Sequence, residues 1–534
     1  MPCTSARTNG KKSRHERHGQ KEPDTLKQPI DYFSSDQLRK DLKGKTVRGG
    51  VVTGVAQCVR IFVGFATIPI LARLLQAEDF GLVAMVGFFT NFAAMFVDAG
   101  LSAATIQSKS LTTQQATNLF WISALLGACV AVASAILAPF VSWFYEEPRL
   151  TSIMLVLSIT FLISGLSIQH QAMLKRSMDF RSLAVLDLGS FIGAQIIGIS
   201  CAAIWRGQPW DYWALVVIPV AMSLFRMLAL WRFCHWRPSF PVKRSGTRSL
   251  VVFGANLTGF NFMNYFVRNA DNLIIGKSWG EEPLGYYERA YKLFLLPTRS
   301  ISVPLSGLMV STLSRLVDEP TRYKNLYVNV VSKLSLVTMP IAAFTFAVSE
   351  SIVDAVLGDG WSDVAPILRV LSLVAISQSI GSTLGWLLVS QGRTADSLRW
   401  ILFAGPIIVL SFLVGNRWGP LGVAIAYSAT SCLIIFPCNV WYTCRRGPVQ
   451  ARDIYRLFAD PIVVSTLVAP LAWYCQELTA DLEPGMRLLV ITGSCLTAVS
   501  AFVLIYPSTR KSILDLLQLF RELRDGKLKK TTEF

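Results

Sequence analysis

The chain has 534 residues, of which 52% are hydrophobic and only 16% are charged. A soluble globular protein usually has about 25% charged residues, so this composition excludes an ordinary soluble domain and indicates a membrane protein. The net charge of +17 would suggest nucleic-acid binding in a soluble chain. Here the basic residues lie in the two tails and in alternate loops, so we expect no nucleic-acid partner.

The first 48 residues are polar and basic, and they lack the apolar core of a signal peptide. Their composition predicts a disordered tail. A second basic tail, residues 508–534, carries apolar side chains at helical spacing among its Lys and Arg residues. We expect it to form an amphipathic segment on the membrane surface.

Fourteen apolar runs are each close to the length of about 20 residues that a spanning helix needs. The runs are continuous rather than alternating, which favours helices over the strands of a barrel. The sequence therefore predicts an all-α integral membrane protein with about 14 transmembrane helices. The expected spans are 49–75, 80–107, 114–143, 150–173, 182–205, 212–231, 249–276, 284–314, 326–349, 364–390, 398–415, 420–442, 457–476 and 487–507.

The loops between these runs differ in charge. If the N-terminus is cytoplasmic, the cytoplasmic loops hold seventeen Lys and Arg residues and the opposite loops hold five. Cytoplasmic loops of membrane proteins carry an excess of positive charge. This alternation supports the span count and predicts that both termini are cytoplasmic.

An internal repeat relates two parts of the chain. The segments RLLQAEDFG at residues 73–81 and KSWGEEPLG at 277–285 each have a cation, then an acidic pair, then a glycine eight residues after the cation. The repeat predicts two six-helix bundles of the same orientation, related by an axis along the membrane normal. The expected bundles are residues 49–231 and 249–442, with the basic segment 232–248 as a cytoplasmic linker and an additional helix pair at 457–507.

Two adjacent spans carry polar stripes. At about 100° per residue, the polar side chains of 249–276 fall on one helix face, and so do the cations of 284–314. Ionisable side chains inside a membrane are costly and usually serve a function. The expected cavity residues are Arg60, which is the equivalent of Asn264 in the repeat, together with Asn261, Asn264, Arg268, Arg289, Lys292 and Arg299.

The chemistry of these stripes favours an anionic substrate, because Arg forms planar, bidentate hydrogen bonds with phosphate. Asp98 and Asp271 are candidates for coupling to an ion, since a carboxylate at membrane depth can exchange a proton or a sodium ion. The structural alternative is a network of ion pairs that fixes helix packing; Arg268 and Asp271, three residues apart, could form one.

The stretch NYFVRNADNLIIGK at residues 264–277, followed by LGYYERAY at 284–291, resembles the Wzx-type polysaccharide flippases. These flippases belong to the multidrug/oligosaccharidyl-lipid/polysaccharide exporter superfamily. The entry to the first span, KGKTVRGG at 43–50, also fits, and the resemblance covers about residues 43–510.

The resemblance implies two six-helix bundles and transfer of an undecaprenyl-pyrophosphate-linked oligosaccharide from the cytoplasmic to the periplasmic leaflet. It implies a location in the inner membrane, and membrane lipids, a polysaccharide polymerase and chain-length machinery as candidate partners. We expect no cofactor, no metal site and no enzymatic activity.

Two other functions stay open. A drug exporter of the same superfamily would be expected to have an acidic, aromatic cavity rather than cationic stripes. A membrane-embedded polysaccharide polymerase or ligase would be expected to have a large outer loop with catalytic groups. The longest predicted outer loop, at about residues 350–363, contains acids but no His, and the sequence shows no evident catalytic constellation.

Overall fold

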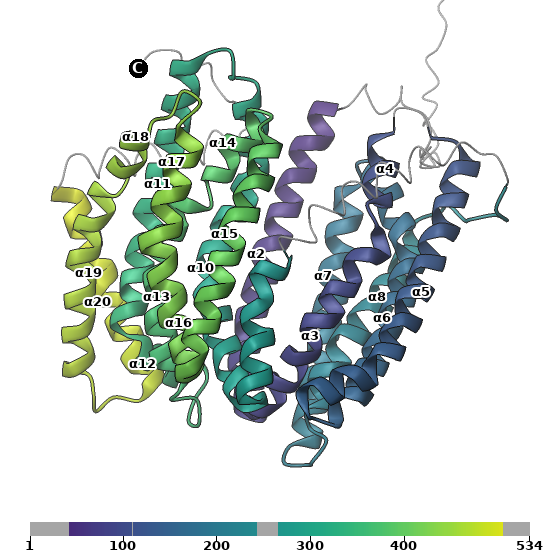
Figure 1. The fold of residues 1–534 in the computed structure, drawn as a ribbon, viewed down its shortest axis with the longest axis horizontal. Helices are drawn as coiled ribbons and strands as arrows, with labels where there is room; N and C mark the ends of the chain where they lie inside the picture. The colour runs from purple at the N-terminus through teal and green to yellow at the C-terminus, as the bar shows by residue number, and fades with distance from the viewer. Residues whose placement is uncertain (1–41, 109–110, 243–264, 506–534) are drawn as a thin grey trace, which may run out of the picture.

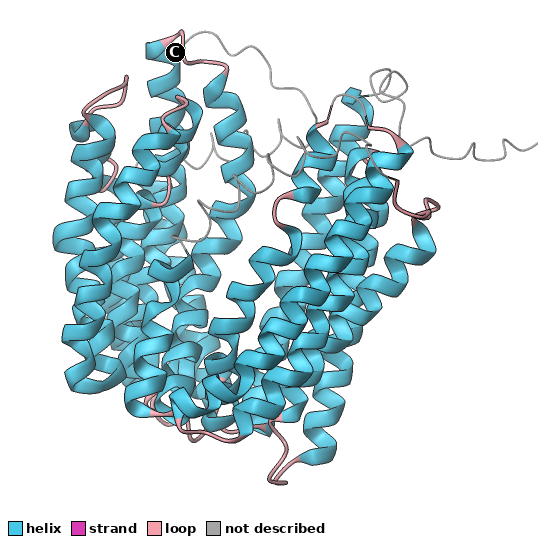
Figure 2. Cartoon of the chain, turned by 45° about the vertical axis from the view of Figure 1, so that its right-hand side comes forward, coloured by secondary structure: helices cyan, strands magenta, loops and turns pink. Residues whose placement is uncertain are grey.

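The computed structural model describes residues 42–108, 111–242 and 265–505, and every regular element in these ranges is a helix (Figure 2). Eleven helical segments within the described ranges are long and apolar enough to cross a membrane. The prediction of an all-α membrane protein is confirmed. The two predicted basic tails, apart from the end of the first, and part of the predicted linker lie outside the described residues.

The first group of helices runs from residue 42 to residue 233. Its members are α2 (Leu42–Leu74), α3 (Ala77–Asp98), α4 (Leu101–Gln107), α5 (Thr113–Tyr145), α6 (Arg149–Arg176), α7 (Phe180–Trp205) and α8 (Trp213–Phe233). These helices pack chiefly on one another and form one side of the molecule (Figure 1).

The second group begins with a helix over residues 265–279. It continues with α10 (Glu281–Ser314), α11 (Pro320–Ala347), α12 (Ser349–Val356), α13 (Val364–Gly381), α14 (Leu384–Ser390), α15 (Thr394–Gly415), α16 (Gly419–Thr430), α17 (Phe436–Cys444), α18 (Ala451–Arg456), α19 (Ala459–Leu478) and α20 (Pro484–Ile505). The pair α19 and α20 lies at the outer edge of the group, against α11 and α12.

Several predicted spans differ in detail from the helices. The first helix begins at Leu42, seven residues before the predicted start. The second predicted span is two helices, because the backbone turns left-handed at Ala99 and Gly100 between α3 and α4. The stretch 394–444, by contrast, agrees with the predicted spans 398–415 and 420–442: it reverses direction at Asn416–Trp418, so that α15 and α16 pack side by side.

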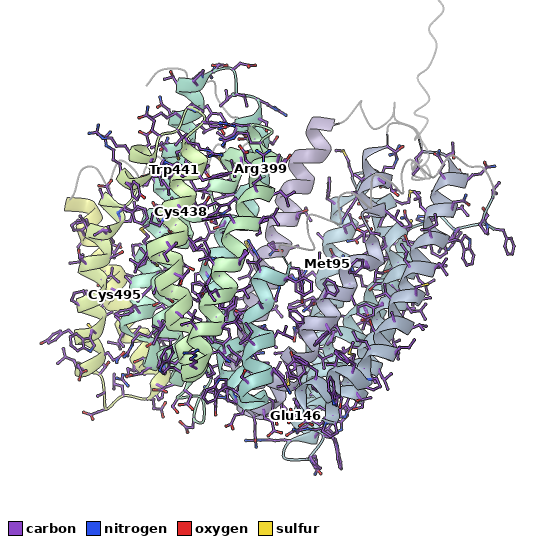
Figure 3. All side chains as sticks on the ribbon, in the orientation of Figure 1. Met95, Glu146, Arg399, Cys438, Trp441 and Cys495 are labelled. Carbon is purple, nitrogen blue, oxygen red and sulfur yellow. The ribbon has the colours of Figure 1, made fainter. Side chains whose placement is uncertain are left out.

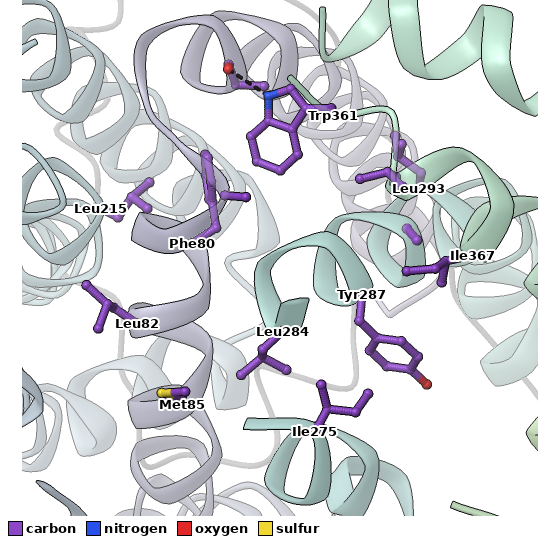
Figure 4. Packing of buried hydrophobic residues seen from close by; sticks show 14 of the residues in the cluster. Phe80, Leu82, Met85, Leu215, Ile275, Leu284, Tyr287, Leu293, Trp361 and Ile367 are labelled. Carbon is purple, nitrogen blue, oxygen red and sulfur yellow. Dashed lines mark hydrogen bonds between the residues drawn. The ribbon is translucent and has the colours of Figure 1, made fainter. Parts of the chain in front are cut away.

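The largest apolar core joins the two groups where α3 meets α10. Figure 4 shows Phe80, Leu82 and Met85 of α3 near Leu284 and Tyr287 of α10. Trp361, in the turn before α13, donates a hydrogen bond from its indole nitrogen to the Ala72 carbonyl oxygen at 3.0 Å (Figure 4). This core ties the two groups together at one end of the molecule.

Candidate functional site

A cavity of about 590 Å³ lies between the two groups of helices. Side chains of α2, α3, α7 and α8 line one wall, and residues 268–272 and the first half of α10 line the other. The apolar wall includes Phe80, Val83 and Phe88 of α3. Its charged lining residues are Arg268, Asp271, Glu288, Arg289 and Lys292. We call this space the central cavity.

Glu288 neutralises much of the charge that α10 brings to the central cavity. Its carboxylate forms an ion pair with Arg289 at 3.1 Å and also pairs with Lys292, one helical turn later. Arg289 is only 9% exposed, and its guanidinium carbon lies 3.9 Å from the centroid of the Phe80 ring across the cavity. A desolvated cation over an aromatic face is attracted to it, so Arg289 also helps to hold α10 against α3.

Arg268 is available to a ligand. Its side chain is exposed and lines the central cavity, and it forms no ion pair with any described residue. The suggested pair with Asp271 is not formed. Instead, buried Asp271 accepts a hydrogen bond from the hydroxyl of Tyr287 at 2.9 Å. Arg268 is therefore the lining cation best placed to bind an anion.

The other predicted site residues lie elsewhere or outside the described part of the chain. Arg60 does not line the central cavity; its guanidinium carbon lies 4.9 Å from the centroid of the Phe191 ring on α7. Asp98 ends α3 and accepts hydrogen bonds from the backbone nitrogen and hydroxyl of Ser102. Asn261, Asn264 and the side chain of Arg299 are not among the described residues.

Three amides of the central cavity were not predicted. Asn91 of α3 and Gln195 of α7 face it from the first group, and Asn269 faces it from the second. The Gln195 side-chain oxygen is buried and has no hydrogen-bond partner among the described residues. Asn91 and Gln195 are single amides in apolar runs and so form no polar stripe, whereas Asn269 lies directly beside Arg268 in the sequence. No cluster of three or more His, Cys, Asp or Glu residues suited to a metal occurs in the described ranges.

The central cavity is closed at one end by a reciprocal contact between the repeated segments. A side chain on Gly81 would collide with the backbone of Glu281, and one on Gly285 would collide with the backbone of Ala77. Ala77 and Glu281 are 204 residues apart in the sequence, and so are Gly81 and Gly285. The two contacts are therefore equivalent under the internal repeat. Only glycine permits so close an approach of two backbones. We call this contact between α3 and α10 the glycine clasp.

Ion pairs between the two groups surround the glycine clasp. Arg149 contacts Glu78 of α3 at 2.5 Å and Glu281 of α10 at 3.2 Å. Lys277 contacts Glu146 at 2.7 Å, and this hydrogen bond and charge hold the pKa of Glu146 below its usual range. Figure 3 shows Glu146 at this end, with Arg399 and Trp441 towards the opposite end. We call the end with Glu146 the closed end.

The chain is similar in sequence to known proteins of polysaccharide biosynthesis. A family model described as "Polysaccharide biosynthesis protein" matches residues 70–383. The lipopolysaccharide biosynthesis protein WzxC of Escherichia coli (strain K12) is 22% identical over 393 residues, covering 72% of this chain and 78% of WzxC. The teichuronic acid biosynthesis protein TuaB of Bacillus subtilis (strain 168) is 24% identical over 431 residues, covering 80% and 88%.

Two solved structures share the fold. The lipid II flippase MurJ in an inward closed conformation superposes with a TM-score of 0.68 at 13% identity, covering 85% of this chain and all of MurJ. A multidrug resistance MATE family transporter in its inward-facing conformation has a TM-score of 0.59 at 15% identity, covering 77% and 99%. At such low identity these likenesses concern the fold alone. The family match extends over more than half of the chain, which therefore belongs to the polysaccharide biosynthesis protein family, as its resemblance to Wzx-type flippases predicted.

Proposed function

We propose that the chain is a flippase that moves an undecaprenyl-pyrophosphate-linked oligosaccharide from the cytoplasmic to the periplasmic leaflet. One observation carries the proposal: the cavity between the two helix groups contains an exposed arginine, Arg268, with no acidic partner among the described residues. In a low-dielectric environment, charge-assisted hydrogen bonds from Arg to a phosphate are strong and directional. The printed roles of WzxC and TuaB in polysaccharide biosynthesis support a substrate of this class.

The remaining groups of the central cavity fit the rest of this assignment. Lys292 has a half-exposed ammonium whose partner, Glu288, is shared with Arg289. Arg289, Lys292 and the side chain of Arg299 are proposed to add to the positive field that Arg268 provides, and Asn261 and Asn264 are proposed to bond to sugar hydroxyls. Arg60 is a weaker candidate for substrate binding and Asp98 a weaker one for ion coupling, because their described contacts are with Phe191 and Ser102.

The proposed topology has fourteen spans, with both termini in the cytoplasm and the protein in the inner membrane. Eleven apolar segments are long enough to span a membrane within the described ranges. Adding α10 and the helix that ends at residue 279, and counting the segment 394–444 as two spans, gives fourteen. The proposed six-helix bundles are 49–231 and 249–442, followed by the pair 457–507. In this topology the closed end faces the periplasm, so the substrate enters from the cytoplasmic side.

The proposed cycle is alternating access, in which the two bundles rock about the central cavity. Opening the periplasmic side requires the glycine clasp and the ion pairs of Arg149 and Lys277 to separate. Asp271 is the proposed coupling group, since it lines the cavity and its one side-chain donor among the described residues is the Tyr287 hydroxyl. Binding of a cation to Asp271 would change the contacts between residues 265–279 and α10.

The test is made in a deletion strain of the native host, in which surface polysaccharide and the sidedness of the lipid-linked oligosaccharide in membrane vesicles are measured. We expect polysaccharide to fall and the intermediate to collect in the cytoplasmic leaflet. The wild-type gene restores transfer, and Arg268→Gln does not. Arg417→Gln, in an exposed turn outside the central cavity, is the matched control and should restore it.

If the intermediate reaches the periplasmic leaflet in the deletion strain, with no redundant flippase present, the proposed function is wrong. A changed drug-resistance profile with normal polysaccharide would instead identify a drug exporter. Turnover of a glycosyl substrate by the purified protein would indicate a membrane enzyme.

A further inference from the structure

A second cavity, of about 560 Å³, lies inside the second group of helices. It is bounded by residues 267–268 and by α10, α13, α14, α15, α16 and α17, and no described side chain of the first group lines it. Its volume is in the range of small-molecule sites, about 300–1,000 Å³. We call it the side pocket.

The lining of the side pocket is mixed: apolar side chains make up most of it, polar groups are spread among them, and it is almost uncharged. Arg268 is the one charged side chain among its described lining residues. The polar groups are hydroxyls and amides from five elements and the turn between α13 and α14: Ser302, Ser306, Ser377, Gln378, Ser382, Ser397, Ser431 and Asn439. Such groups both donate and accept hydrogen bonds, which suits a ligand rich in hydroxyls and lacking charge.

Two of these polar groups lack partners. The side-chain oxygen of Gln378 and the hydroxyl of Ser302 are buried and form no hydrogen bond to any described residue. Buried polar atoms are nearly always hydrogen-bonded, because leaving them unsatisfied is costly. They come from α13 and α10, which border the side pocket from different directions, so a bound ligand could satisfy both.

The helices around the side pocket are irregular where they meet it. The chain is interrupted between α13 and α14 at Ser382 and Thr383, and it forms a π-helix at Ser431–Ile435. Ser382, Ser431 and Ile435 all line the pocket. Single π-turns are frequent at functional sites, and interrupted helices at membrane depth are tolerated where they are buried in protein or line a cavity.

Aromatic rings complete the lining. Trp386, Trp400 and Tyr427 border the side pocket, and the Trp400 ring centroid lies 5.6 Å from that of Tyr442. An indole or phenol combines a large apolar face with a polar edge. The apolar face of a pyranose ring packs against such a surface while its hydroxyls bond to neighbouring amides.

The side pocket and the central cavity share a wall. Arg268, Tyr291 and Leu295 line both spaces. A molecule with a phosphate at Arg268 could therefore extend into the side pocket without crossing the first group of helices. The charged part of the substrate would stay at the junction, and an uncharged part would occupy the side pocket.

We propose that the side pocket binds uncharged hexopyranosyl residues of the lipid-linked oligosaccharide while Arg268 holds its phosphate. The inference rests on the proposed function and deepens it. It assigns discrimination between sugar-bearing and sugar-free carrier lipid to Gln378 and Ser302, and phosphate binding to Arg268.

The test measures binding of two probes to the purified full-length protein in nanodiscs. One probe is undecaprenyl pyrophosphate without sugar, and the other is the lipid-linked oligosaccharide extracted from the native host. We expect wild type to bind the second more tightly. Gln378→Met and Ser302→Ala should each weaken its binding by about fivefold or more, as for loss of a buried hydrogen bond, and leave the first unchanged. Arg268→Gln should weaken both.

Gln208→Met, at an exposed position, and Ser494→Ala, at a half-buried one, are the matched controls; both lie away from the two cavities and should alter neither affinity. Two variants on separate helices guard against misfolding of one, and monodisperse elution with an unchanged melting temperature identifies a folded variant. Equal binding of both probes by wild type, or equal effects of Gln378→Met and Ser302→Ala on both probes, would overturn the side-pocket assignment and leave the flippase standing. If wild type binds neither probe better than an uncharged lipid, the proposed function itself fails.

Discussion

Arg268 and Arg289 are both cavity cations, but their surroundings give them different roles. Arg289 is buried against Phe80 and paired with Glu288, so its charge is partly used within the protein. Arg268 has no such partner among the described residues and borders both cavities. Removal of a buried paired charge destabilises a protein, whereas removal of an unpaired exposed charge does not.

Arg268→Gln should therefore reduce transport with little effect on stability. A charge-assisted hydrogen bond contributes about 1.5–3 kcal/mol, so transfer should fall roughly tenfold or more, and Arg268→Lys should retain part of it. Transfer in vesicles and thermal denaturation of the purified protein are the measurements. A large drop in melting temperature for Arg268→Gln would show that the residue is structural.

Tyr287→Phe should destabilise the protein, because the Tyr287 hydroxyl is the side-chain donor to buried Asp271. Leaving a buried carboxylate oxygen without its donor costs about 1–3 kcal/mol, which thermal denaturation in detergent detects as a lowered melting temperature. Tyr286→Phe is the matched control, since the Tyr286 hydroxyl donates to Glu282 at an exposed site and should be nearly neutral. Similar losses for the two variants would contradict this account of Asp271.

At the scale of elements, α3 and α10 approach most closely at the glycine clasp. The two backbones touch because neither Gly81 nor Gly285 has a side chain. Gly81→Val should force the helices apart and weaken the closed end. Spin labels at Gln208 and Ser362, in exposed turns of the two groups, should then report a longer distance in a variant without native cysteines.

Gly189→Val is the matched control for the clasp, because a side chain at Gly189 of α7 would meet nothing within 4 Å. The label distance in Gly189→Val should equal that of the parent. If Gly81→Val and Gly189→Val give the same distance distribution, the close backbone contact does not hold the end closed.

The same labels should show a pH dependence at the closed end. Lys277 lowers the pKa of Glu146 from its ordinary value of 4.5, so the ionised carboxylate favours the closed arrangement. A lowered pKa contributes stability that is present above the ordinary value and is lost as the pH falls through the lowered one. The labelled protein should therefore open more readily below about pH 4.5. Lys277→Met should remove the Glu146 part of this response, and an unchanged pH profile in Lys277→Met would exclude the pair as its source.

Much of the fold could be predicted from the sequence, because the bilayer demands apolar runs of fixed length. The predicted span 182–205 and α7, Phe180–Trp205, differ by two residues at one end. Hydropathy did not reveal the break between α3 and α4, the break between α13 and α14, or the π-helix at Ser431–Ile435. These features change the backbone without changing the apolar composition.

The cavity residues could be predicted where several polar side chains share one helix face. That periodicity found Arg268, Asp271, Arg289 and Lys292, all of which line the central cavity. It could not find Gln195, because a single amide has no period. Nor could it show that Arg60 lies over the Phe191 ring, since that contact depends on how α2 packs against α7.

At the scale of the whole molecule, alternating access requires the closed end to open in every cycle. Glu146 and Lys277 belong to different helix groups, and their charged atoms lie 2.7 Å apart. In a variant without native cysteines, Glu146→Cys with Lys277→Cys should react with a short bifunctional maleimide that contains a disulfide. Transfer in vesicles should stop after cross-linking and return after reduction.

A pair within one group controls for the chemistry of the reagent. Glu319 and Arg322 both belong to the second group and contact each other at 2.6 Å at the start of α11. Cysteines at these two positions should cross-link without loss of transfer, because no relative motion of the groups changes their separation. If cross-linking at 146 and 277 also leaves transfer intact, the closed end does not need to open. The two halves of the molecule would then act on the substrate by some route other than rocking about the central cavity.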